Sequence, residues 1–149
     1  LADTFVYGQS NWFSRKVLKS EQIGKVAFVA TKADLIPVSQ RENLLNLLHQ
    51  VSEGARAKFK DKPIEFEHFL VSAMQITDEG SSAQAIRYTD SNGRYVESSF
   101  EPIPATLKDM EEGAHFPVPS AQVPNDYKAR ILAGKGVDRL LQFLLGKGE

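Results

Sequence analysis

An apolar run that ends abruptly in polar residues constrains the fold of this chain more than any other segment. Residues 26–30 read Val-Ala-Phe-Val-Ala, which is typical of a strand buried on both faces of a parallel sheet. A helix from residue 39 to about Phe59 and a second strand from Ile64 to Ala73 follow it. Because a strand, a helix and a strand form a βαβ unit, we expect two parallel strands joined by a right-handed crossover.

The helix between the strands has its own start signal and its own apolar face. Ser39-Gln40-Arg41-Glu42 has the form of a capping box, so the helix is expected to begin there. Apolar residues at helical spacing predict the stripe that faces the sheet: Leu44, Leu45, Leu47, Leu48, Val51, Ala55 and Phe59.

The second half of the chain has a different pattern. Residues 85–99 are expected to form a hairpin that turns at Asp90-Ser91-Asn92-Gly93. Residues 101–125 contain five prolines and little periodicity, which indicates either an ordered but irregular insertion or a mobile loop. A short helix over residues 136–145 is apolar on nearly every side, so it is expected to be buried.

The residues that follow the first strand have a specific chemical meaning. Thr31-Lys32-Ala33-Asp34 matches [Asn/Thr]-Lys-x-Asp, a signature of guanine-nucleotide-binding proteins. The Asp34 carboxylate only accepts hydrogen bonds, and it can take both the ring N–H and the exocyclic amine of guanine. Adenine offers no such pair of donors. The aliphatic stem of Lys32 can lie against the purine face.

The second strand ends in a matching position. Guanine-nucleotide proteins place a Ser-Ala loop at the end of the next parallel strand, where a backbone N–H meets the guanine carbonyl oxygen. Ser72-Ala73 stands there in this chain, and adjacent parallel strands bring Asp34 and Ala73 to the same edge of the sheet. The alternative is that Asp34 caps a loop and that Ser72-Ala73 simply ends a strand.

The chain lacks a phosphate-binding loop. A P-loop reads Gly-x-x-x-x-Gly-Lys-[Ser/Thr], so that backbone N–H groups surround the phosphates and a hydroxyl holds magnesium. The nearest match is Gly134-Lys135-Gly136, but it has no following hydroxyl, and Ala129 occupies the position of the first glycine. We interpret this tripeptide as a helix entry. The chain by itself is therefore expected to bind a base and to carry no catalytic residue.

Composition excludes several other classes of function. The net charge of −1 gives no electrostatic case for a nucleic-acid partner. The absence of cysteine excludes disulfides and thiolate zinc sites, and it fits a reducing compartment. His49, His68 and His115 have no metal-ligand spacing, so we expect ordinary packing or surface positions and no metal site.

The first residues form a pattern with two interpretations. Residues 3–19 are mostly helical in pattern, and they carry Trp12 and Phe13 opposite Arg15 and Lys16. We favour a helix that covers the sheet. The alternative is that residues 9–20 lie on a membrane surface, although no apolar stretch approaches the length of about 20 residues that spans a bilayer.

These residues together resemble the C-terminal part of the YcjX-like family of bacterial stress proteins, which are Ras-like P-loop GTP-binding proteins. The similarity rests on Tyr7-Gly8-Gln9, Trp12 to Lys16, Val26 to Asp34, Val71-Ser72-Ala73 and the closing helix. It is good over residues 5–80 and weaker through the insertion. Thr31 replaces the commoner asparagine, and Met74 replaces the lysine or leucine that often follows Ser-Ala.

The resemblance implies an α/β fold that is the C-terminal portion of a Ras-like P-loop NTPase. Residues 1–75 would be the C-terminal half of the nucleotide-binding domain, residues 76–128 an insertion, and residues 129–149 a terminal helix that packs on the α/β part. Thr31, Lys32, Asp34, Ser72 and Ala73 would bind the base of GTP or GDP.

The resemblance also implies what lies outside this chain. Its start at Leu1 is a hint that a segment precedes it. An upstream part of the same protein would hold the phosphate loop, the switch segments and Mg²⁺, and the complete, cytoplasmic protein would be a GTPase. A protein effector or a membrane surface is a further candidate partner. The competing interpretation is a non-catalytic interaction module on an α/β scaffold whose nucleotide site is degenerate.

Overall fold

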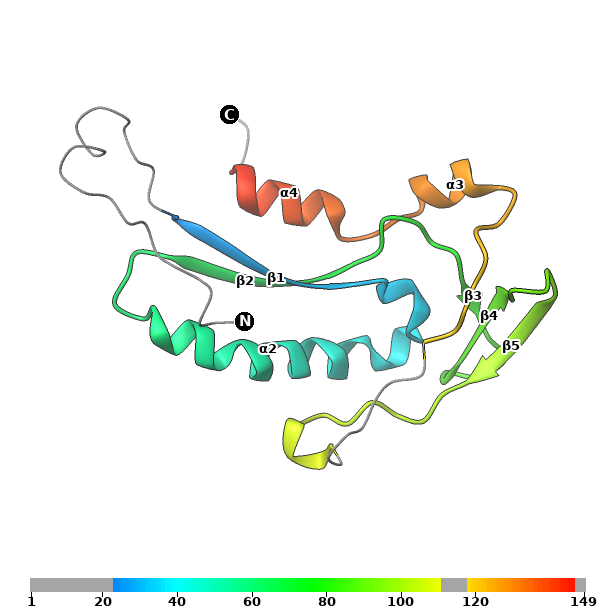
Figure 1. Cartoon of the computed structure of the whole chain (residues 1–149), viewed down its shortest axis with the longest axis horizontal. Helices are drawn as coiled ribbons and strands as arrows, with labels where there is room; N and C mark the ends of the chain where they lie inside the picture. Colours follow the sequence, from blue (N-terminus) through cyan, green and yellow to red (C-terminus); the bar gives the residue numbers. More distant parts are fainter. Residues whose placement is uncertain (1–22, 111–117, 147–149) are drawn as a thin grey trace.

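The two predicted strands lie side by side in the structure, a computed structural model that describes residues 23–110 and 118–146. Strands β1 (Lys25–Thr31) and β2 (Glu65–Val71) pair in parallel from Lys25 opposite Glu65 to Thr31 opposite Val71. Helix α2 (Arg41–Lys58) connects them and packs against one face, while α4 (Val137–Leu145) packs against the other (Figure 1). The βαβ prediction is confirmed, and the chain has an α/β fold.

The start of α2 differs from the prediction. Two 3-10 turns, η2 (Ala33–Leu35) and η3 (Val38–Gln40), precede the helix, and Gln40 takes the N-cap position without a side-chain capping bond. The Ser39 hydroxyl instead donates to the Ala83 carbonyl oxygen at 2.5 Å. The predicted capping box was therefore wrong, because η3 uses the residues that the box needed and Ser39 contacts a distant loop.

The apolar stripe of α2 is only partly buried. Leu47 and Phe59 are buried as predicted, but Val51 is 63% exposed. Ser52, a polar residue, is buried beside the sheet. The two strands described here form a narrow sheet, so α2 carries more apolar surface than that sheet covers.

Two burial predictions were wrong for the same reason. Strand β1 was expected to be buried on both faces, yet residues 25–30 are half-buried and Thr31 is exposed. Helix α4 was expected to be buried, yet it contains no buried residue and Leu145 is 81% exposed. Among the described residues, β1 has a strand neighbour on one edge only, so neither element is enclosed.

A second, antiparallel sheet lies beyond the carboxyl ends of β1 and β2 (Figure 1). Its strands are β3 (Asp78–Glu79), β4 (Ala85–Thr89) and β5 (Tyr95–Ser99), in that order. The predicted hairpin turn is confirmed: the Gly93 N–H donates to the Asp90 carbonyl oxygen at 3.0 Å, and Gly93 has a φ of 76°.

The remaining segments are short. In the described part of residues 101–125, the only regular element is the 3-10 turn η4 (Leu107–Asp109), in keeping with the predicted irregular insertion. Helix α3 (Tyr127–Leu132) then leads to α4. The predicted helix over residues 3–19 lies outside the described residues, and so does the membrane-surface alternative. No helix within residues 23–110 and 118–146 combines the length and apolar character that crossing a bilayer requires.

A histidine pair joins α2 to β2 in the core. The ring centroids of His49 and His68 are 3.7 Å apart, and the Ser52 Oγ lies 2.6 Å from the His68 Nε2. On its other side, His68 stacks on Phe28 with centroids 5.2 Å apart. Burial lowers the pKa of His68 below its ordinary value. His49 and Arg56 lower this pKa further, and Glu67 opposes them.

This arrangement predicts a pH dependence of stability. The folded state favours neutral His68, so its contribution is complete above the unfolded pKa near 6.5 and is lost as the pH falls below it. We expect the urea midpoint of the wild type to fall more between pH 7.5 and pH 5.5 than that of a His68→Gln variant. An equal fall in both proteins would contradict the role of His68.

Candidate functional site

The two predicted motifs meet at the carboxyl ends of the parallel strands. Turn η2 follows β1 and places Asp34 at this edge, and Ser72 follows β2 directly. The Ser72 hydroxyl lies 2.8 Å from the Asp34 Oδ1 and 2.6 Å from the Met74 carbonyl oxygen, so it shares its one proton between two acceptors, and Asp34 and Ser72 are each only 4% exposed. Residues far apart in the sequence thus form one buried polar pair, as adjacent parallel strands require.

Asp34 makes further bonds to the loop between β2 and β3. The Ile76 N–H donates to the Asp34 Oδ2 at 3.1 Å, and the Thr77 hydroxyl donates to the Asp34 backbone carbonyl oxygen. Both carboxylate oxygens therefore have protein donors in this structure. Since a carboxylate has about four acceptor positions, each oxygen keeps further capacity.

Three of the other predicted residues share one cavity. Thr31, Lys32 and Ala73 border a cavity of about 550 Å³ next to the strand ends. Lys32 adopts the left-handed backbone conformation, with φ of 58° and ψ of 35°. Among the described non-glycine residues no other has a positive φ. Such strain costs about 1–3 kcal/mol and concentrates at functional sites.

The Ala73 backbone is available to a ligand. Ala73 is exposed, and within the described chain its N–H donates to no protein acceptor. This is the N–H that the sequence predicted would meet the carbonyl oxygen of guanine.

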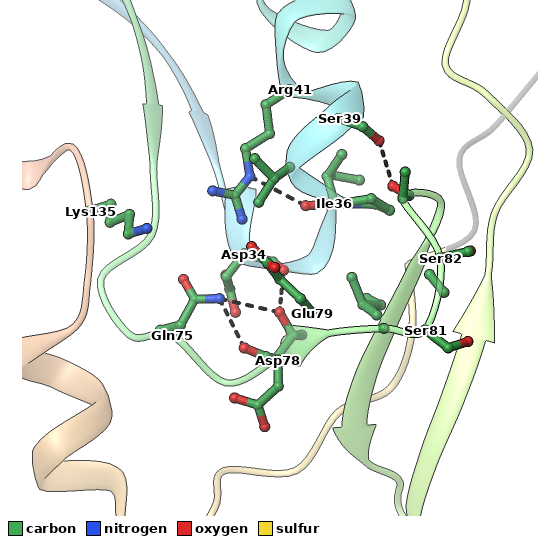
Figure 2. Close-up of a pocket in the computed structure, with 17 residues that line it drawn as sticks. Asp34, Ile36, Ser39, Arg41, Gln75, Asp78, Glu79, Ser81, Ser82 and Lys135 are labelled. Atoms are coloured by element: carbon green, nitrogen blue, oxygen red, sulfur yellow. Dashed lines mark hydrogen bonds between the residues drawn. The ribbon is translucent and has the colours of Figure 1, made fainter.

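Asp34 borders a different, neighbouring cavity of about 360 Å³ (Figure 2). Arg41, Gln75, Glu79 and Lys135 also line it. The Arg41 Nε donates to the Ile36 carbonyl oxygen at 3.3 Å. Burial lowers the pKa of Arg41, and the carboxylates of Asp34 and Glu79 oppose that shift. The structure therefore does not place the Asp34 carboxylate on the cavity that Lys32 and Ala73 border.

Gly134-Lys135-Gly136 has a role that the sequence interpretation missed. It does precede α4, with Gly136 at the N-cap, so the predicted helix entry is confirmed. It also pairs with the end of β2: the Lys135 N–H donates to the Ser72 carbonyl oxygen at 2.8 Å, and the Ser72 N–H donates to the Lys135 carbonyl oxygen at 2.9 Å. The tripeptide thereby fixes the backbone of the predicted base loop.

Both glycines are required by this close approach. A Cβ on Gly134 would lie 2.7 Å from the carbonyl oxygens of Ser72 and Ala73. A Cβ on Gly136 would overlap the Leu70 carbonyl oxygen, and Gly136 has a φ of 82°. Two glycines flanking one residue before a helix were the signal that could have indicated this contact.

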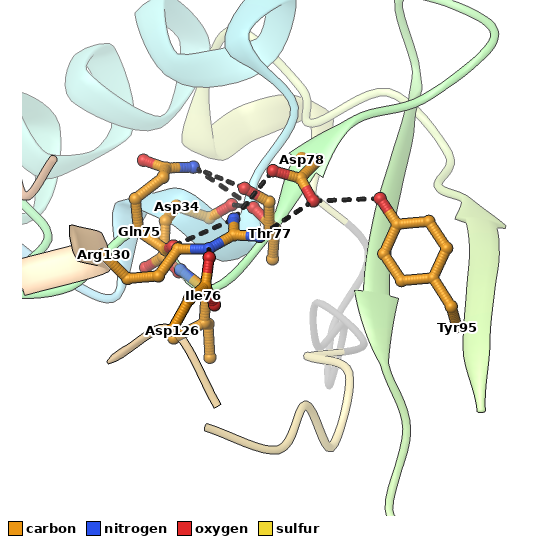
Figure 3. A network of polar contacts seen from close by, with 8 residues as sticks. All are labelled: Asp34, Gln75, Ile76, Thr77, Asp78, Tyr95, Asp126 and Arg130. Atoms are coloured by element: carbon orange, nitrogen blue, oxygen red, sulfur yellow. Dashed lines mark hydrogen bonds and ion pairs between the residues drawn. The ribbon is translucent and has the colours of Figure 1, made fainter. Parts of the chain in front are cut away.

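A polar network holds the other side of the same loop (Figure 3). Arg130 of α3 pairs with Asp78 at 2.7 Å and with Asp126 at 3.1 Å. The Tyr95 hydroxyl donates to Asp78 at 2.9 Å, and the Gln75 N–H donates to the Arg130 carbonyl oxygen at 3.0 Å. Hydrogen bonding to Arg130 lowers the pKa of Asp78, against the effect of burial. Helix α3 and the hairpin are thus both tied to residues 75–78.

The side chains of the described residues form no cluster that could ligate a metal ion by itself. Within residues 23–110 and 118–146, no group of three or more His, Asp or Glu side chains is arranged to hold a metal ion.

Comparison with known proteins identifies relatives of this chain. The YcjX-like family, DUF463, matches residues 1–148. The chain is 31% identical over 125 residues to the Ras-like GTPase YcjX of Escherichia coli (strain K12). That match covers 83% of this chain and 23% of the relative. The resemblance noted from the sequence is therefore confirmed, and the chain spans less than a quarter of the length of this relative.

The contacts around the glycines predict that alanine destabilises the protein at Gly134 and Gly136 and stabilises it at Gly54. Gly134→Ala and Gly136→Ala should each lower the free energy of unfolding by about 1–3 kcal/mol, because the added methyl group meets backbone. Gly54→Ala is the matched control, since Gly54 lies in α2 with no atom near its Cβ position. That control should stabilise by about 0.5–1 kcal/mol. Chemical denaturation measures all three, and unchanged stability in the first two variants would contradict the contact.

Proposed function

This chain belongs to the YcjX-like family, and we propose that it is the part of a Ras-like GTP-binding protein that recognises the guanine base. The hydrogen bond between the Ser72 hydroxyl and the Asp34 Oδ1 carries the proposal. It joins the Thr31–Asp34 motif to the Ser72-Ala73 loop, and both motifs were predicted from their residues to act on the same base.

The predicted residues have distinct roles in this proposal. Asp34 selects guanine by accepting its ring N–H and exocyclic amine, which is a charge-assisted pair of bonds. Lys32 lays its stem on the purine face. The free N–H of Ala73 donates to the guanine carbonyl oxygen. Thr31 borders the same cavity at the end of β1.

Base binding requires a local exchange of hydrogen bonds. The Ile76 N–H now donates to the Asp34 Oδ2, and burial leaves little of Asp34 accessible. We infer that the base donors replace the Ile76 N–H, which needs movement of the loop at residues 73–77. The carboxylate loses one bond from Ile76 and gains two from guanine, and all three are charge-assisted.

The complete protein would supply the rest of the nucleotide site. We infer that upstream residues hold the phosphates and Mg²⁺ and perform any hydrolysis, since no P-loop sequence occurs in these 149 residues. Among the described residues, one edge of β1 has no strand partner. That edge and the half-buried faces of β1 fit docking of the upstream part of the P-loop NTPase fold.

One observation favours the second candidate, a non-catalytic interaction module. The Asp34 carboxylate is buried, and both its oxygens accept bonds from protein groups. This is also what a loop-fixing aspartate without a nucleotide ligand would show.

Exchange of the carboxylate for an amide distinguishes the two functions. In the full-length, upstream-extended protein, fluorescent GDP should be displaced by GTP and not by ATP. Asp34→Asn should lose GDP binding and gain xanthine nucleotide, because the amide donates where xanthine presents a carbonyl. Competition binding with GDP, GTP, ATP and XTP measures this.

Asp61→Asn is the matched control, since exposed Asp61 lies between α2 and β2 at the opposite end of the sheet. It should bind GDP as the wild type does. Absence of nucleotide binding by the wild type, or an Asp34→Asn variant that retains GDP specificity, would favour the interaction module.

A further inference from the structure

The cavity beside Lys32 and Ala73 has a wall that comes from outside the βαβ unit. Pro119, Ser120, Ala121 and Val123 border it, and they belong to the irregular insertion over residues 101–125. The wall is fixed to the hairpin by Gln122, whose N–H donates to the Thr89 carbonyl oxygen at 2.8 Å. The Gln122 Nε2 also donates to the Ser91 carbonyl oxygen at 2.7 Å. Residues 119–123 therefore have a defined position beside the cavity.

The lining of this cavity suits a flat aromatic base. It includes Lys32 and Ala73 together with four apolar residues from the strand ends and the adjoining loops, namely Leu35, Val71, Met74 and Ile76. A purine buries two faces while its edge makes hydrogen bonds. Lys32 accounts for one face, so a second apolar surface is needed opposite the first.

Val123 is the candidate for this second surface. It borders the cavity and is 61% exposed, so its methyl groups have free surface to offer a ligand. A singly exposed valine needs no explanation in general, but this one borders the cavity that Thr31, Lys32 and Ala73 also border, next to the cavity that Asp34 borders.

We propose that Val123 packs against the guanine base and that residues 119–123 form a second wall of the base site. This inference rests on the proposed function, and it assigns to this part of the insertion a role in retaining nucleotide. The contact is with the base alone, so it affects GDP and GTP equally.

The hairpin and α3 connect this wall to the loop at residues 75–78. Gln122 anchors it to the turn of the hairpin, and Tyr95 and Arg130 anchor the hairpin and α3 to residues 75–78. The inner and outer sides of the cavity are therefore held by one connected set of contacts. A partner that displaced the hairpin would act on both sides of the base.

The test compares two exposed valines in the full-length protein. Val118 is 56% exposed and does not border this cavity, so Val118→Ser is the matched control for Val123→Ser. Stopped-flow release of fluorescent GDP and of fluorescent GTP should be about fivefold faster for Val123→Ser, because two methyl groups leave the base contact. Val118→Ser should release nucleotide at the wild-type rate. Val123→Ile keeps an apolar side chain at this position, so its release should be as slow as that of the wild type.

GDP binding by an Asp34→Asn variant, measured in parallel, distinguishes failure of this inference from failure of the proposed function. If Asp34→Asn abolishes GDP binding while both serine variants release nucleotide at the wild-type rate, the wall is overturned and the base site stands. If Asp34→Asn leaves GDP binding unchanged, both are overturned. Faster release of GDP but not of GTP by Val123→Ser would also overturn a contact with the base. Thermal unfolding of the serine variants checks that each remains folded.

Discussion

The contacts at the carboxyl ends of β1 and β2 depend on the Asp34 carboxylate. Through its two oxygens it fixes Ser72 at the end of β2 and Ile76 in the following loop, while its own carbonyl oxygen accepts from Thr77. Because the group is buried and charge-assisted bonds are strong in such surroundings, these bonds hold the loop close to the strand ends.

The residues around Asp34 explain why the loop that follows β2 stays close to the sheet. Gly134 and Gly136 let the start of α4 approach the backbone of Leu70 to Ala73, where any side chain would collide. On the opposite side, Arg130 bonds to both Gln75 and Asp78. Any movement of the loop at residues 73–77 must therefore work against contacts from α3, the segment before α4 and the hairpin.

Several apolar surfaces of the described chain are left partly exposed. The half-buried β1, the exposed Val51 and the exposed end of α4 are what a sheet that continues beyond the described residues would leave behind. The YcjX-like family and the 23% coverage of its Escherichia coli member agree with that view. The pattern of a strand buried on both faces therefore predicted more burial than β1 and β2 show among the described residues.

The sequence by itself determined the local structure. Apolar runs and turn residues predicted β1, α2, β2, the hairpin at Asp90 to Gly93 and the approach of Asp34 and Ala73 to one edge of the sheet, because periodicity and strand order act over short distances or follow from the βαβ rule. Only the tertiary structure decided that Ser39 contacts Ala83, that Gly134 to Gly136 hold the base loop, and that Asp34 and Lys32 border different cavities. These depend on the approach of segments far apart in the chain, and no local pattern encodes the distance between them.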